Sequence, residues 1–563
     1  MEHIKQIINI PEILFKKGVR HTVISAGSRS APLTLSFVRY KEINTKIIID
    51  ERSAAFIALG IAQKTKIPTV LICTSGTAVL NYAPAIAEAY YQKIPLIILT
   101  ADRPAELIDQ FENQSIRQKN IYSNYCIKSF ELPDNFNSSE SSDFLIRTVS
   151  LAFETSLYPC KGPVHINIPL REPIYPNIPN ESFSYDKNIK VRDFIIPKIV
   201  LDKNDLLDLE KKWNLADKKL ILIGQNTTNL DNAILKLKKN NSNVVISDIT
   251  SNIHKNQEMF FSDILFSTKN QDLKETIKPD ILLTYGGQIV SKSIKNFIKT
   301  SNIKEHWHIQ DDNFFGDPFS SITKIITSNP EYIFEKLAKI ENKNNSNYQE
   351  IWRNENNIIE KKIKKFFNNS DFNDFYAIYK ILQEIPDKTI LHLGNSTPIR
   401  YANYISMFFA NKNITVFSNR GTSGIDGCVS TAVGSALSTN KLVTLIVGDL
   451  SFFYDRNALW NNYDLKNLRI IVLNNHGGQI FRMLESSSKL NELDEYFETK
   501  NNISIKNTIK DTCLKYFSVD SKDNLNKNLK SFFNKSKKGK IMELELDSIK
   551  SISFFNEFKK EFF

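Results

Sequence analysis

Short apolar runs separated by polar turns recur along the whole chain. Each run is rich in Val, Ile and Leu, and most of them end in Gly, Ser, Thr, Asp or Asn, as buried parallel strands do before a loop. The predicted strands are 21–25, 47–49, 69–73, 96–99, 164–168, 220–223, 244–246, 281–283, 306–308, 389–393, 414–417, 442–447, 470–473 and 542–546. Helical patterns lie between many of them, so repeated βα units and doubly wound parallel sheets are expected.

Two stretches of different composition divide this pattern into three parts. Residues 171–200 contain several prolines and few apolar runs, which indicates a surface linker. Residues 340–370 are rich in Lys and Asn and are expected to form a second linker with some helix. The expected fold class is α/β, with three doubly wound parallel-sheet domains over residues 1–180, 190–340 and 370–563. The first and third parts look like two copies of one architecture.

The composition narrows the class of protein. The chain has 563 residues, of which 41% are hydrophobic, but no run approaches the roughly 20 apolar residues that a membrane helix needs. The N-terminus lacks the basic-then-apolar pattern of a signal peptide, so we expect a cytoplasmic protein without a membrane partner. Five dispersed cysteines argue against a disulfide framework or a zinc site.

Charge and histidine patterns exclude two further kinds of site. The net charge of +11 comes mainly from lysines spread among Asn and Ile. Because no basic block is interleaved with aromatic residues, a solvated surface is expected and not a nucleic-acid interface. Anionic substrates would also suit a locally basic site. His306 and His308 share one face of a predicted strand, but no third metal ligand lies nearby, so we expect a structural role for the pair.

Polar residues end two neighbouring predicted strands in the last part. The run 442–447 leads to Asp449, and the run 470–473 leads to Asn475, two residues before Gly477. At the carboxyl ends of strands, where open α/β sheets bind ligands, carboxylate and amide oxygens are hard ligands for Mg²⁺. A glycine lets the backbone approach, so the carbonyl of Gly477 is a predicted third ligand. Because Gly-Asp after a strand is common, an ordinary βα turn is the alternative at Asp449 alone.

The spacing of these strand ends resembles the signature of thiamin-diphosphate enzymes, which opens with Gly-Asp-Gly and closes with Asn-Asn. Leu450 stands where that signature has its second glycine. Further stretches point to the same group of enzymes: SAGSRSAPLTL (25–35), DERSAAFIALGIA (50–62), TSGTAVLNYAPAIAEA (74–89), LTADRPAELID (99–109), NQSIRQ (113–118), GNSTPIR (394–400), SNRGTSGIDG (418–427), GDLSFFYDRNAL (448–459) and LNNHGGQIF (473–481).

Together these motifs resemble the family of 2-succinyl-5-enolpyruvyl-6-hydroxy-3-cyclohexene-1-carboxylate synthases of the menaquinone pathway. That family consists of thiamin-diphosphate enzymes of the pyruvate-decarboxylase-like group, and Gly-Asp-Leu-Ser is its usual form, so Leu450 supports the resemblance. The resemblance covers the first and third parts and is weak over 180–275 and 325–385.

The resemblance implies a fold, an assembly and a reaction. It implies a pyrimidine-binding domain over 1–180, a central domain over 190–340 and a diphosphate-binding domain over 370–563. It also implies a homodimer or a dimer of dimers, with thiamin diphosphate and Mg²⁺ or Mn²⁺ bound between subunits. The implied reaction is decarboxylation of 2-oxoglutarate followed by addition of the succinyl-semialdehyde carbanion to isochorismate.

The resemblance also assigns roles to particular residues. Glu51 is the implied catalytic acid at the pyrimidine ring of the cofactor. The implied metal ligands are Asp449, Asn475 and Gly477, and the other cofactor-binding residues are Ser423 and Ile425. The substrates bear carboxylates, which cations and polar groups recognise. The implied substrate-binding residues are Ser28, Arg29, Arg103, Gln114, Lys292, Ser396, Arg400, Arg420 and Phe481.

Other readings of single residues stay open at this point. Glu51 alone reads as a charge favoured by the start of a helix. Core packing explains Ile425 and, almost as well as a pocket role, Phe481. Arg103 has Asp102 and Asp109 as alternative partners.

Two other functions compete with the implied one. The first is another thiamin-diphosphate lyase of the acetolactate-synthase type, against which the set of arginines and the SNRGTSGIDG motif argue. The second is a catalytically inactive scaffold or nucleic-acid binder, against which the intact Glu51, Asp449 and Asn475 argue.

Overall fold

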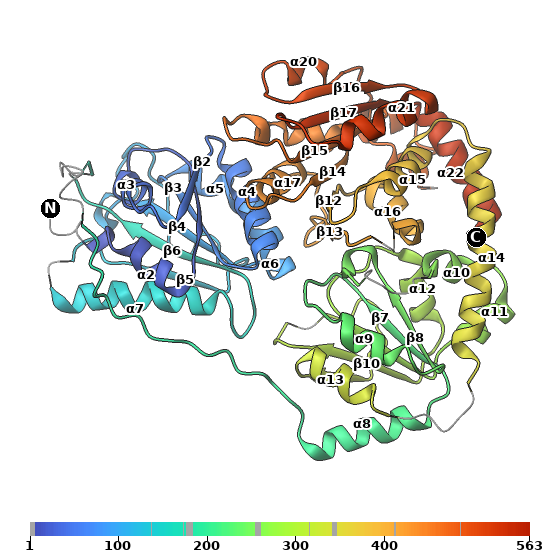
Figure 1. Cartoon of the computed structure of the whole chain (residues 1–563). Coiled ribbons are helices and arrows are strands. Elements are labelled where there is room, and N and C mark those ends of the chain that lie inside the picture. Colours follow the sequence, from blue (N-terminus) through green and yellow to red (C-terminus); the bar gives the residue numbers. More distant parts are fainter. Residues whose placement is uncertain are drawn as a thin grey trace. The chain divides into compact units, whose positions relative to one another are not determined.

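The computed structural model describes residues 6–136, 138–172, 174–175, 184–253, 260–314, 316–340, 346–409, 412–484 and 486–563. Within these residues the chain forms three parallel β-sheets flanked by helices (Figure 1). The predicted α/β class with three parallel sheets is therefore confirmed.

The first sheet has the strand order β2-β1-β3-β4-β6-β5, and all of its strands are parallel. Its strands are β1 (His21–Ile24), β2 (Asn44–Ile47), β3 (Thr69–Cys73), β4 (Leu96–Asp102), β5 (Lys128–Glu131) and β6 (Pro163–Pro169). The described helices of this part are α2 (Ile10–Lys17), α3 (Ala31–Arg39), α4 (Glu51–Thr65), α5 (Thr77–Asn81), α6 (Ala83–Gln92) and α7 (Ser139–Thr155).

The middle sheet has the order β11-β10-β9-β7-β8. Its strands are β7 (Lys219–Ile223), β8 (Asn243–Ser247), β9 (Ile281–Tyr285), β10 (Glu305–Gln310) and β11 (Lys324–Thr327). Its described helices are α8 (Lys203–Leu215), α9 (Asp231–Leu237), α10 (Ser262–Ser267), α11 (Gln271–Ile277), α12 (Lys292–Thr300), α13 (Pro330–Leu337) and α14 (Tyr348–Asn368).

The third sheet has the order β13-β12-β14-β15-β17-β16, which repeats the topology of the first sheet strand for strand. Its strands are β12 (Ile390–Leu393), β13 (Thr415–Phe417), β14 (Val443–Gly448), β15 (Leu468–Asn474), β16 (Lys515–Val519) and β17 (Lys540–Glu545). The described helices are α15 (Asp374–Glu384), α16 (Thr397–Tyr404), α17 (Cys428–Leu437), α18 (Asp449–Tyr454), α19 (Ile480–Met483), α20 (Lys506–Ile509), α21 (Lys522–Phe533) and α22 (Ser548–Phe562).

The strands that the hydrophobic pattern missed or shifted lie at sheet edges. β2 was expected over 47–49 and lies over Asn44–Ile47, while β5, β11 and β16 were not expected at all. Most residues of these four strands are partly or fully exposed, so their sequences lack the apolar runs of the central strands.

The segment 340–370 was expected to be a linker with some helix, and its described part is mostly helix that packs into the core. Residues 346–370 consist mainly of α14, a helix of 21 residues. Its buried side chains include Trp352, Asn356, Ile359, Ile363 and Phe367, at helical spacings of three and four, which place them on one face. Most of the Lys and Asn residues within α14 are exposed and form the opposite face of the helix.

The predicted linker over 171–200 fits the residues that the structure describes there, because none of them lies in a helix or strand. Pro173, Pro176 and Pro179, which indicated this linker, lie outside the described residues. The structural role expected for the histidine pair is supported: Thr284 Oγ1 lies 3.0 Å from His306 Nε2 and 2.9 Å from His308 Nδ1. Burial lowers the pKa of His306 to about 4.

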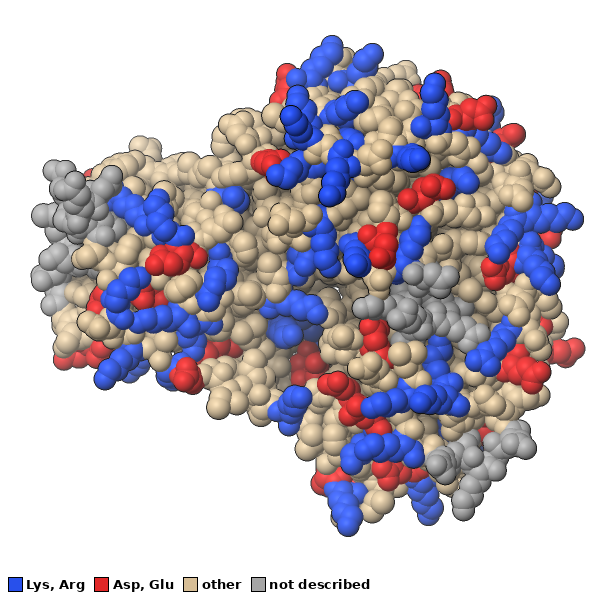
Figure 2. All heavy atoms as spheres, in the orientation of Figure 1, with Lys and Arg blue, Asp and Glu red and all other residues tan. Residues whose placement is uncertain are grey.

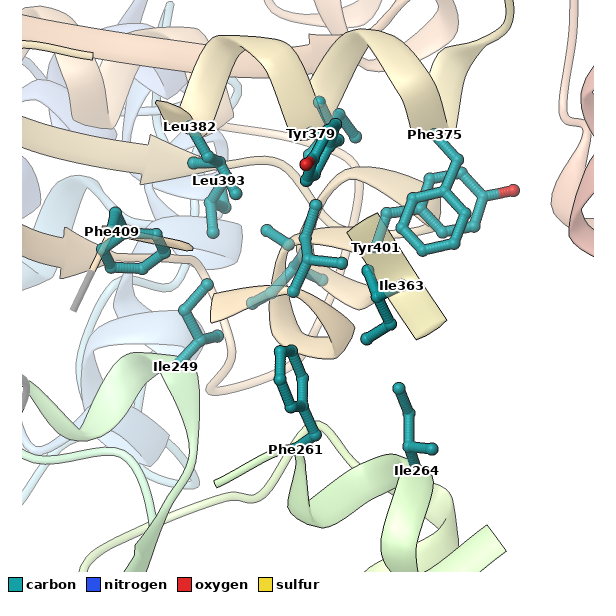
Figure 3. Packing of buried hydrophobic residues seen from close by; sticks show 14 of the residues in the cluster. Ile249, Phe261, Ile264, Ile363, Phe375, Tyr379, Leu382, Leu393, Tyr401 and Phe409 are labelled. Carbon is teal, nitrogen blue, oxygen red and sulfur yellow. The ribbon is translucent and has the colours of Figure 1, made fainter. Parts of the chain in front are cut away.

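The chain packs into two compact units. The first contains residues 1–196, 419–440 and 452–465, and the second contains 197–418, 441–451 and 466–563. A core around the first sheet stabilises the first unit. In the second unit one continuous core joins side chains from the middle and third sheets, and Figure 3 shows part of it around α15.

The distribution of charged side chains and the state of the cysteines agree with what the composition predicted. On the face drawn in Figure 2, Lys and Arg are interspersed with Asp and Glu. All five cysteines are free thiols. In the part of the chain that the structure describes, no helix has both the length and the apolar character that crossing a membrane requires.

Candidate active site

Two strand ends of the third sheet place the predicted metal ligands in the second unit. β14 and β15 are parallel neighbours, with Gly448 paired to Leu473. Asp449 follows β14 as the first residue of α18, and Asn475 follows β15 one residue beyond its end. Both side chains are buried, with exposed fractions of 2% and 7%. The parallel register therefore brings the carboxylate and the amide to adjacent positions on one sheet edge.

The hydrogen bonds of these two side chains leave one oxygen of each unpartnered. Asp449 Oδ1 accepts from the Leu450 backbone N–H at 2.8 Å, whereas Oδ2 is buried without a partner. Asn475 Nδ2 donates to Gln479 Oε1, whereas Oδ1 is buried without a partner. Because an unsatisfied buried acceptor is costly, an unpartnered oxygen at each of two adjacent strand ends suits a cation as a ligand. The pair fits Mg²⁺, which prefers oxygen ligands.

The backbone N–H of Gly477 lies beside the Asp449 carboxyl, and the role of the Gly477 carbonyl as a metal ligand stays a prediction. Burial raises the pKa of the Asp449 carboxyl to about 6, and the backbone N–H groups of Leu450 and Gly477 and the charge of His476 oppose that rise. Gly477 has φ 156°, and a Cβ there would overlap the carbonyl oxygen of Glu498, so only glycine fits. No described group of three His, Cys, Asp or Glu residues is arranged to hold a metal, which is compatible with a site built on one carboxylate.

Two of the predicted substrate-binding cations lie on helices that one buried carboxylate connects. Asp263 accepts from Ser291 Oγ at 2.6 Å and from Asn403 Nδ2 at 3.1 Å. Ser291 caps α12, whose first residue is Lys292, and Asn403 lies one turn from Arg400 in α16. The Asp263 bridge therefore fixes the helix that contains Lys292 relative to the helix that contains Arg400.

Two further predicted substrate-binding residues, Ser396 and Phe481, also lie in the part of the chain that forms the third sheet. Ser396 has φ 75° and precedes α16, and its carbonyl oxygen accepts from Arg400 Nη1 at 2.6 Å. Phe481 in α19 is 37% exposed and packs against Phe497 with ring centroids 5.8 Å apart. Its exposure does not support the core-packing alternative.

Glu51 lies at the carboxyl edge of the first sheet, in the first unit. It is the half-buried first residue of α4, and Asp50 caps this helix by accepting from the Ser53 N–H at 3.2 Å. Burial raises the pKa of the Cys73 thiol, and the charge of Glu51 adds to the rise. Because Cys73 is the last residue of β3, Glu51 faces the end of that strand. A role as a mere helix-start charge and the implied catalytic role both remain compatible with this position.

Arg29 and Arg103 form a pair of buried cations in the first unit. Arg29 Nη1 donates to the Leu170 carbonyl at 3.0 Å, and Arg103 Nε donates to the Asn113 carbonyl at 3.0 Å. Burial lowers the pKa of the Arg29 guanidinium, and the positive charge of Arg103 lowers it further. Arg29 Nε and Arg103 Nη1 are buried without hydrogen-bond acceptors.

The alternative partners suggested for Arg103 do not hold its side chain. Asp102 Oδ1 accepts from the backbone N–H of Arg103 at 2.7 Å. Asp109 instead pairs with Arg117 at 2.8 Å. The carboxylate recorded nearest to the Arg103 guanidinium is Glu112, at 4.0 Å.

Ser28 and Gln114 are exposed on the same unit. Ser28 Oγ accepts from the Tyr175 hydroxyl at 3.1 Å. Gln114 has φ 51°, and a Cβ at Gly76 would touch its backbone at 3.1 Å, so Gly76 permits this close approach. Gln114 thus lies beside the loop that follows β3.

The loop 419–427 contributes the remaining predicted residues to the first unit. Arg420 is buried, Ser423 has φ 64°, and Ile425 is 43% exposed, which does not support core packing for Ile425. Glu88 of α6 holds this loop: its carboxylate accepts from the Gly421 N–H at 2.7 Å and from the Thr422 N–H and hydroxyl at 2.6 Å each.

Sequence reasoning missed several buried polar residues that hold these loops. They are Glu88, Gln118, Asp263, Asp374 and Gln479. Gln118 Oε1 accepts from the Gly76 N–H at 2.9 Å. Glu88 lies within a motif of the resemblance, but nothing in its local pattern distinguishes a buried from a solvated carboxylate.

Comparison with known proteins identifies the family. Residues 9–121 match the family described as "Thiamine pyrophosphate enzyme, N-terminal TPP binding domain", and residues 199–393 match "Middle domain of thiamine pyrophosphate". The 2-succinyl-5-enolpyruvyl-6-hydroxy-3-cyclohexene-1-carboxylate synthase of Cytophaga hutchinsonii is 43% identical over 561 residues, covering 98% of both chains. The synthase of Bacteroides thetaiotaomicron is 33% identical, covering 94% of this chain and 93% of its own. The chain belongs to this synthase family.

The synthase fold extends to more distant enzymes. The solved benzoylformate decarboxylase from Polynucleobacter necessarius superposes with a TM-score of 0.72 at 15% identity, covering 97% of this chain and 99% of that chain. At such low identity this likeness shows the fold alone. As a member of the synthase family, the chain is an enzyme that uses thiamin diphosphate and a divalent metal such as Mg²⁺.

Proposed function

We propose that this synthase-family enzyme decarboxylates 2-oxoglutarate and joins the remaining succinyl unit to isochorismate. The products are 2-succinyl-5-enolpyruvyl-6-hydroxy-3-cyclohexene-1-carboxylate and CO₂, and the reaction belongs to menaquinone biosynthesis. The structural observation that supports this most directly is the pair of unpartnered oxygens on Asp449 and Asn475, at the strand ends where the family motif expects its metal.

The chain's own residues have separable roles in this proposal. Asp449, Asn475 and the Gly477 carbonyl hold Mg²⁺ or Mn²⁺, and the ion offsets the charge of the cofactor's diphosphate. When bound, thiamin diphosphate supplies the electron sink for decarboxylation. Glu51 holds a proton at the pyrimidine nitrogen of the cofactor. Ser423 and Ile425 contact the cofactor from the loop 419–427.

Cations and polar groups bind the substrate carboxylates. Arg29 and Arg103 are suited to this role, because each has a buried guanidinium nitrogen without an acceptor. Lys292 and Arg400, on helices that Asp263 connects, are assigned to the same role. The remaining substrate-binding residues are Ser28, Gln114, Ser396, Arg420 and Phe481.

A product assay tests the reaction. The protein, thiamin diphosphate, Mg²⁺, 2-oxoglutarate and isochorismate are combined, and the expected adduct is detected by mass spectrometry. Pyruvate alone is the matched control substrate. Condensation of pyruvate without use of isochorismate would favour the alternative, a lyase of the acetolactate-synthase type.

The proposal extends to a cytoplasmic homodimer or dimer of dimers, with residues 1–180 binding the pyrimidine and 370–563 the diphosphate across the subunit interface. Mixed dimers test this arrangement. Glu51→Gln and Asp449→Ala are each expected to be inactive alone. After the two are unfolded and refolded together, a mixed dimer would contain one site with both native residues, restoring about a quarter of the native activity at random pairing. No restoration would place both residues of a site in one subunit.

A further inference from the structure

A chain of buried polar side chains extends from the proposed metal site into the core of the second unit. Asn475 Nδ2 donates to Gln479 Oε1 at 2.5 Å, and Gln479 Nε2 donates to Asp374 Oδ2 at 3.1 Å. The exposed fractions of Asn475, Gln479 and Asp374 are 7%, 2% and 0%. These hydrogen bonds therefore link three side chains that are almost fully buried.

The direction of these hydrogen bonds determines which end of Asn475 faces the metal. A side-chain amide has an acceptor end and a donor end of similar size, and only the oxygen binds a cation. Burial raises the pKa of the Asp374 carboxyl to about 7. In its ionised form Asp374 Oδ2 only accepts, so Gln479 turns its NH₂ group toward Asp374 and its oxygen toward Asn475. Asn475 must then turn its NH₂ group toward Gln479. This arrangement leaves Asn475 Oδ1 at the sheet edge, where it is buried without a partner.

We propose that Gln479 and Asp374 are positioning residues that hold the Asn475 amide with its oxygen toward the divalent metal. The inference rests on the proposed metal site of Asp449, Asn475 and Gly477. Without Gln479, the amide could rotate and present its NH₂ group to the cation, which repels it.

The packing around Asp374 makes it a fixed end for this chain. Asp374 is the first residue of α15, which Asn373 caps by accepting from the Tyr376 N–H at 2.9 Å. The next residue, Phe375, stacks on Tyr401 with ring centroids 4.4 Å apart. Figure 3 shows Phe375 and Tyr401 in contact within the core, so α15 holds Asp374 in one place.

The main test is the affinity for Mn²⁺, measured by the loss of the free-ion electron paramagnetic resonance signal in the presence of thiamin diphosphate. Gln479→Met has nearly the same size but removes the acceptor for Asn475. Its affinity for Mn²⁺ is expected to fall by about tenfold to a hundredfold, as when an outer partner of a metal ligand is lost. Gln349→Met is the matched control, because Gln349 is also buried and donates to the carbonyls of Lys238 and Asn243. Its Mn²⁺ affinity should not change.

Testing Gln479→Met in a second variant, Asn475→Asp, separates a positioning role from a general disruption of the site. In Asn475→Asp both side-chain oxygens bind metal, so the orientation of residue 475 no longer matters. Adding Gln479→Met to this background should change the affinity for Mn²⁺ by less than about threefold, which is a coupling that a double-mutant cycle measures. An equal loss in both backgrounds would overturn the proposal.

Two further variants keep the outcome clear. Asp374→Asn preserves the size of the side chain but can present either end to Gln479, so a smaller, severalfold loss of Mn²⁺ affinity is expected; unchanged affinity would contradict the proposal even if Gln479→Met did not fold. Asp449→Ala tests the metal site itself. If it leaves Mn²⁺ binding intact, the proposed function fails, whereas loss in Asp449→Ala with no effect of Gln479→Met refutes the positioning role alone.

Discussion

The first and third sheets have the same topology, but their strand-end aspartates differ in hydrogen bonding. In the first sheet Asp102 uses both oxygens, accepting from the Arg103 N–H at 2.7 Å and from Asn167 Nδ2 at 2.8 Å. In the third sheet Asp449 and Asn475 each keep a buried oxygen without a donor. The unpartnered guanidinium nitrogens of Arg29 and Arg103 are instead found at the first edge. The residues proposed to bind ligands therefore differ between the copies: guanidinium groups in the first, and a carboxylate and an amide oxygen in the third.

This difference shows how one architecture serves two ligand chemistries. Unpartnered guanidinium donors suit anions, and unpartnered carboxylate and amide oxygens suit a cation. Asp102 and Asn167 are paired with each other, whereas the residues proposed to bind ligands keep unpartnered atoms.

The largest expected effect comes from exchanging a strand-end aspartate for alanine in each copy. Asp449→Ala should abolish the rise in melting temperature caused by thiamin diphosphate plus Mg²⁺, because a ligand stabilises only the state that binds it. The unliganded protein should lose less stability than Asp102→Ala does, since Asp449 accepts from the Leu450 N–H alone and its Oδ2 is a buried acceptor without a partner. Thermal melting with and without the ligands measures both effects.

Asp102→Ala is the counterpart in the first copy, and the expectation is reversed. It should lower the free energy of unfolding by about 1–3 kcal/mol, because Asn167 Nδ2 and the Arg103 N–H lose their acceptor. The ligand-induced rise in melting temperature should persist. If Asp449→Ala and Asp102→Ala changed the stability and the ligand-induced rise in melting temperature alike, the carboxyl edges of the two sheets would not differ in the proposed way.

The next effect concerns the acid of the first copy. Glu51→Gln keeps the shape of the side chain but cannot share a proton, so kcat should fall by about a hundredfold or more. Stabilisation by thiamin diphosphate and Mg²⁺ should remain, because the metal ligands lie in the third copy. Glu331→Gln, at an exposed position in the first turn of α13, is the control. Turnover within about threefold of the parent would remove Glu51 from the catalytic role.

A smaller effect is expected from replacing the arginines that are proposed to bind the substrate carboxylates, one in each copy. Arg29→Ala and Arg400→Ala should each raise KM for a carboxylate substrate by about tenfold to a hundredfold, the value of a charged hydrogen bond of about 1.5–3 kcal/mol. Affinity for thiamin diphosphate should stay nearly constant. Arg147→Ala, on the exposed side of α7, is the control. Weakened cofactor binding with unchanged KM would make these arginines diphosphate ligands instead.

The sequence was sufficient for features that repeat along the chain. The central strands of both copies are buried on both faces, so their apolar runs located them to within a few residues. Asp449 and Asn475 were found because each directly follows such a run. The edge strands β2 and β5 were shifted or missed, since a half-exposed strand has no distinct apolar pattern.

Partners that are distant in sequence could not be found in this way. Glu88 accepts from Gly421, and Gln479 donates to Asp374, in each case across more than a hundred residues. The sequence gives the type of a polar residue but not whether its side chain is buried or solvated, which only the fold shows. For the same reason α14 was expected to be a linker with some helix, because its polar face dominates its composition.

The smallest effect concerns the contact between the two copies' equivalent helices. α4 follows the second strand of the first copy and α17 follows the second strand of the third, and the two pack together in the first unit. A Cβ at Gly60 of α4 would overlap the Thr431 carbonyl of α17, and a Cβ at Gly434 of α17 would overlap the Ile57 carbonyl of α4. The two helices therefore approach each other through reciprocal glycines.

Gly60→Ala and Gly434→Ala should each lower the free energy of unfolding by about 1–3 kcal/mol, the usual cost of forcing an extra methyl group into a packed contact. That cost exceeds the fraction of a kcal/mol by which alanine normally favours a helix over glycine. Gly316→Ala is the control, because a Cβ there meets nothing within 4 Å. Urea unfolding of the three variants gives the comparison. If Gly434→Ala raised the urea midpoint, helix propensity would outweigh the contact, and the close crossing of α4 and α17 would be wrong.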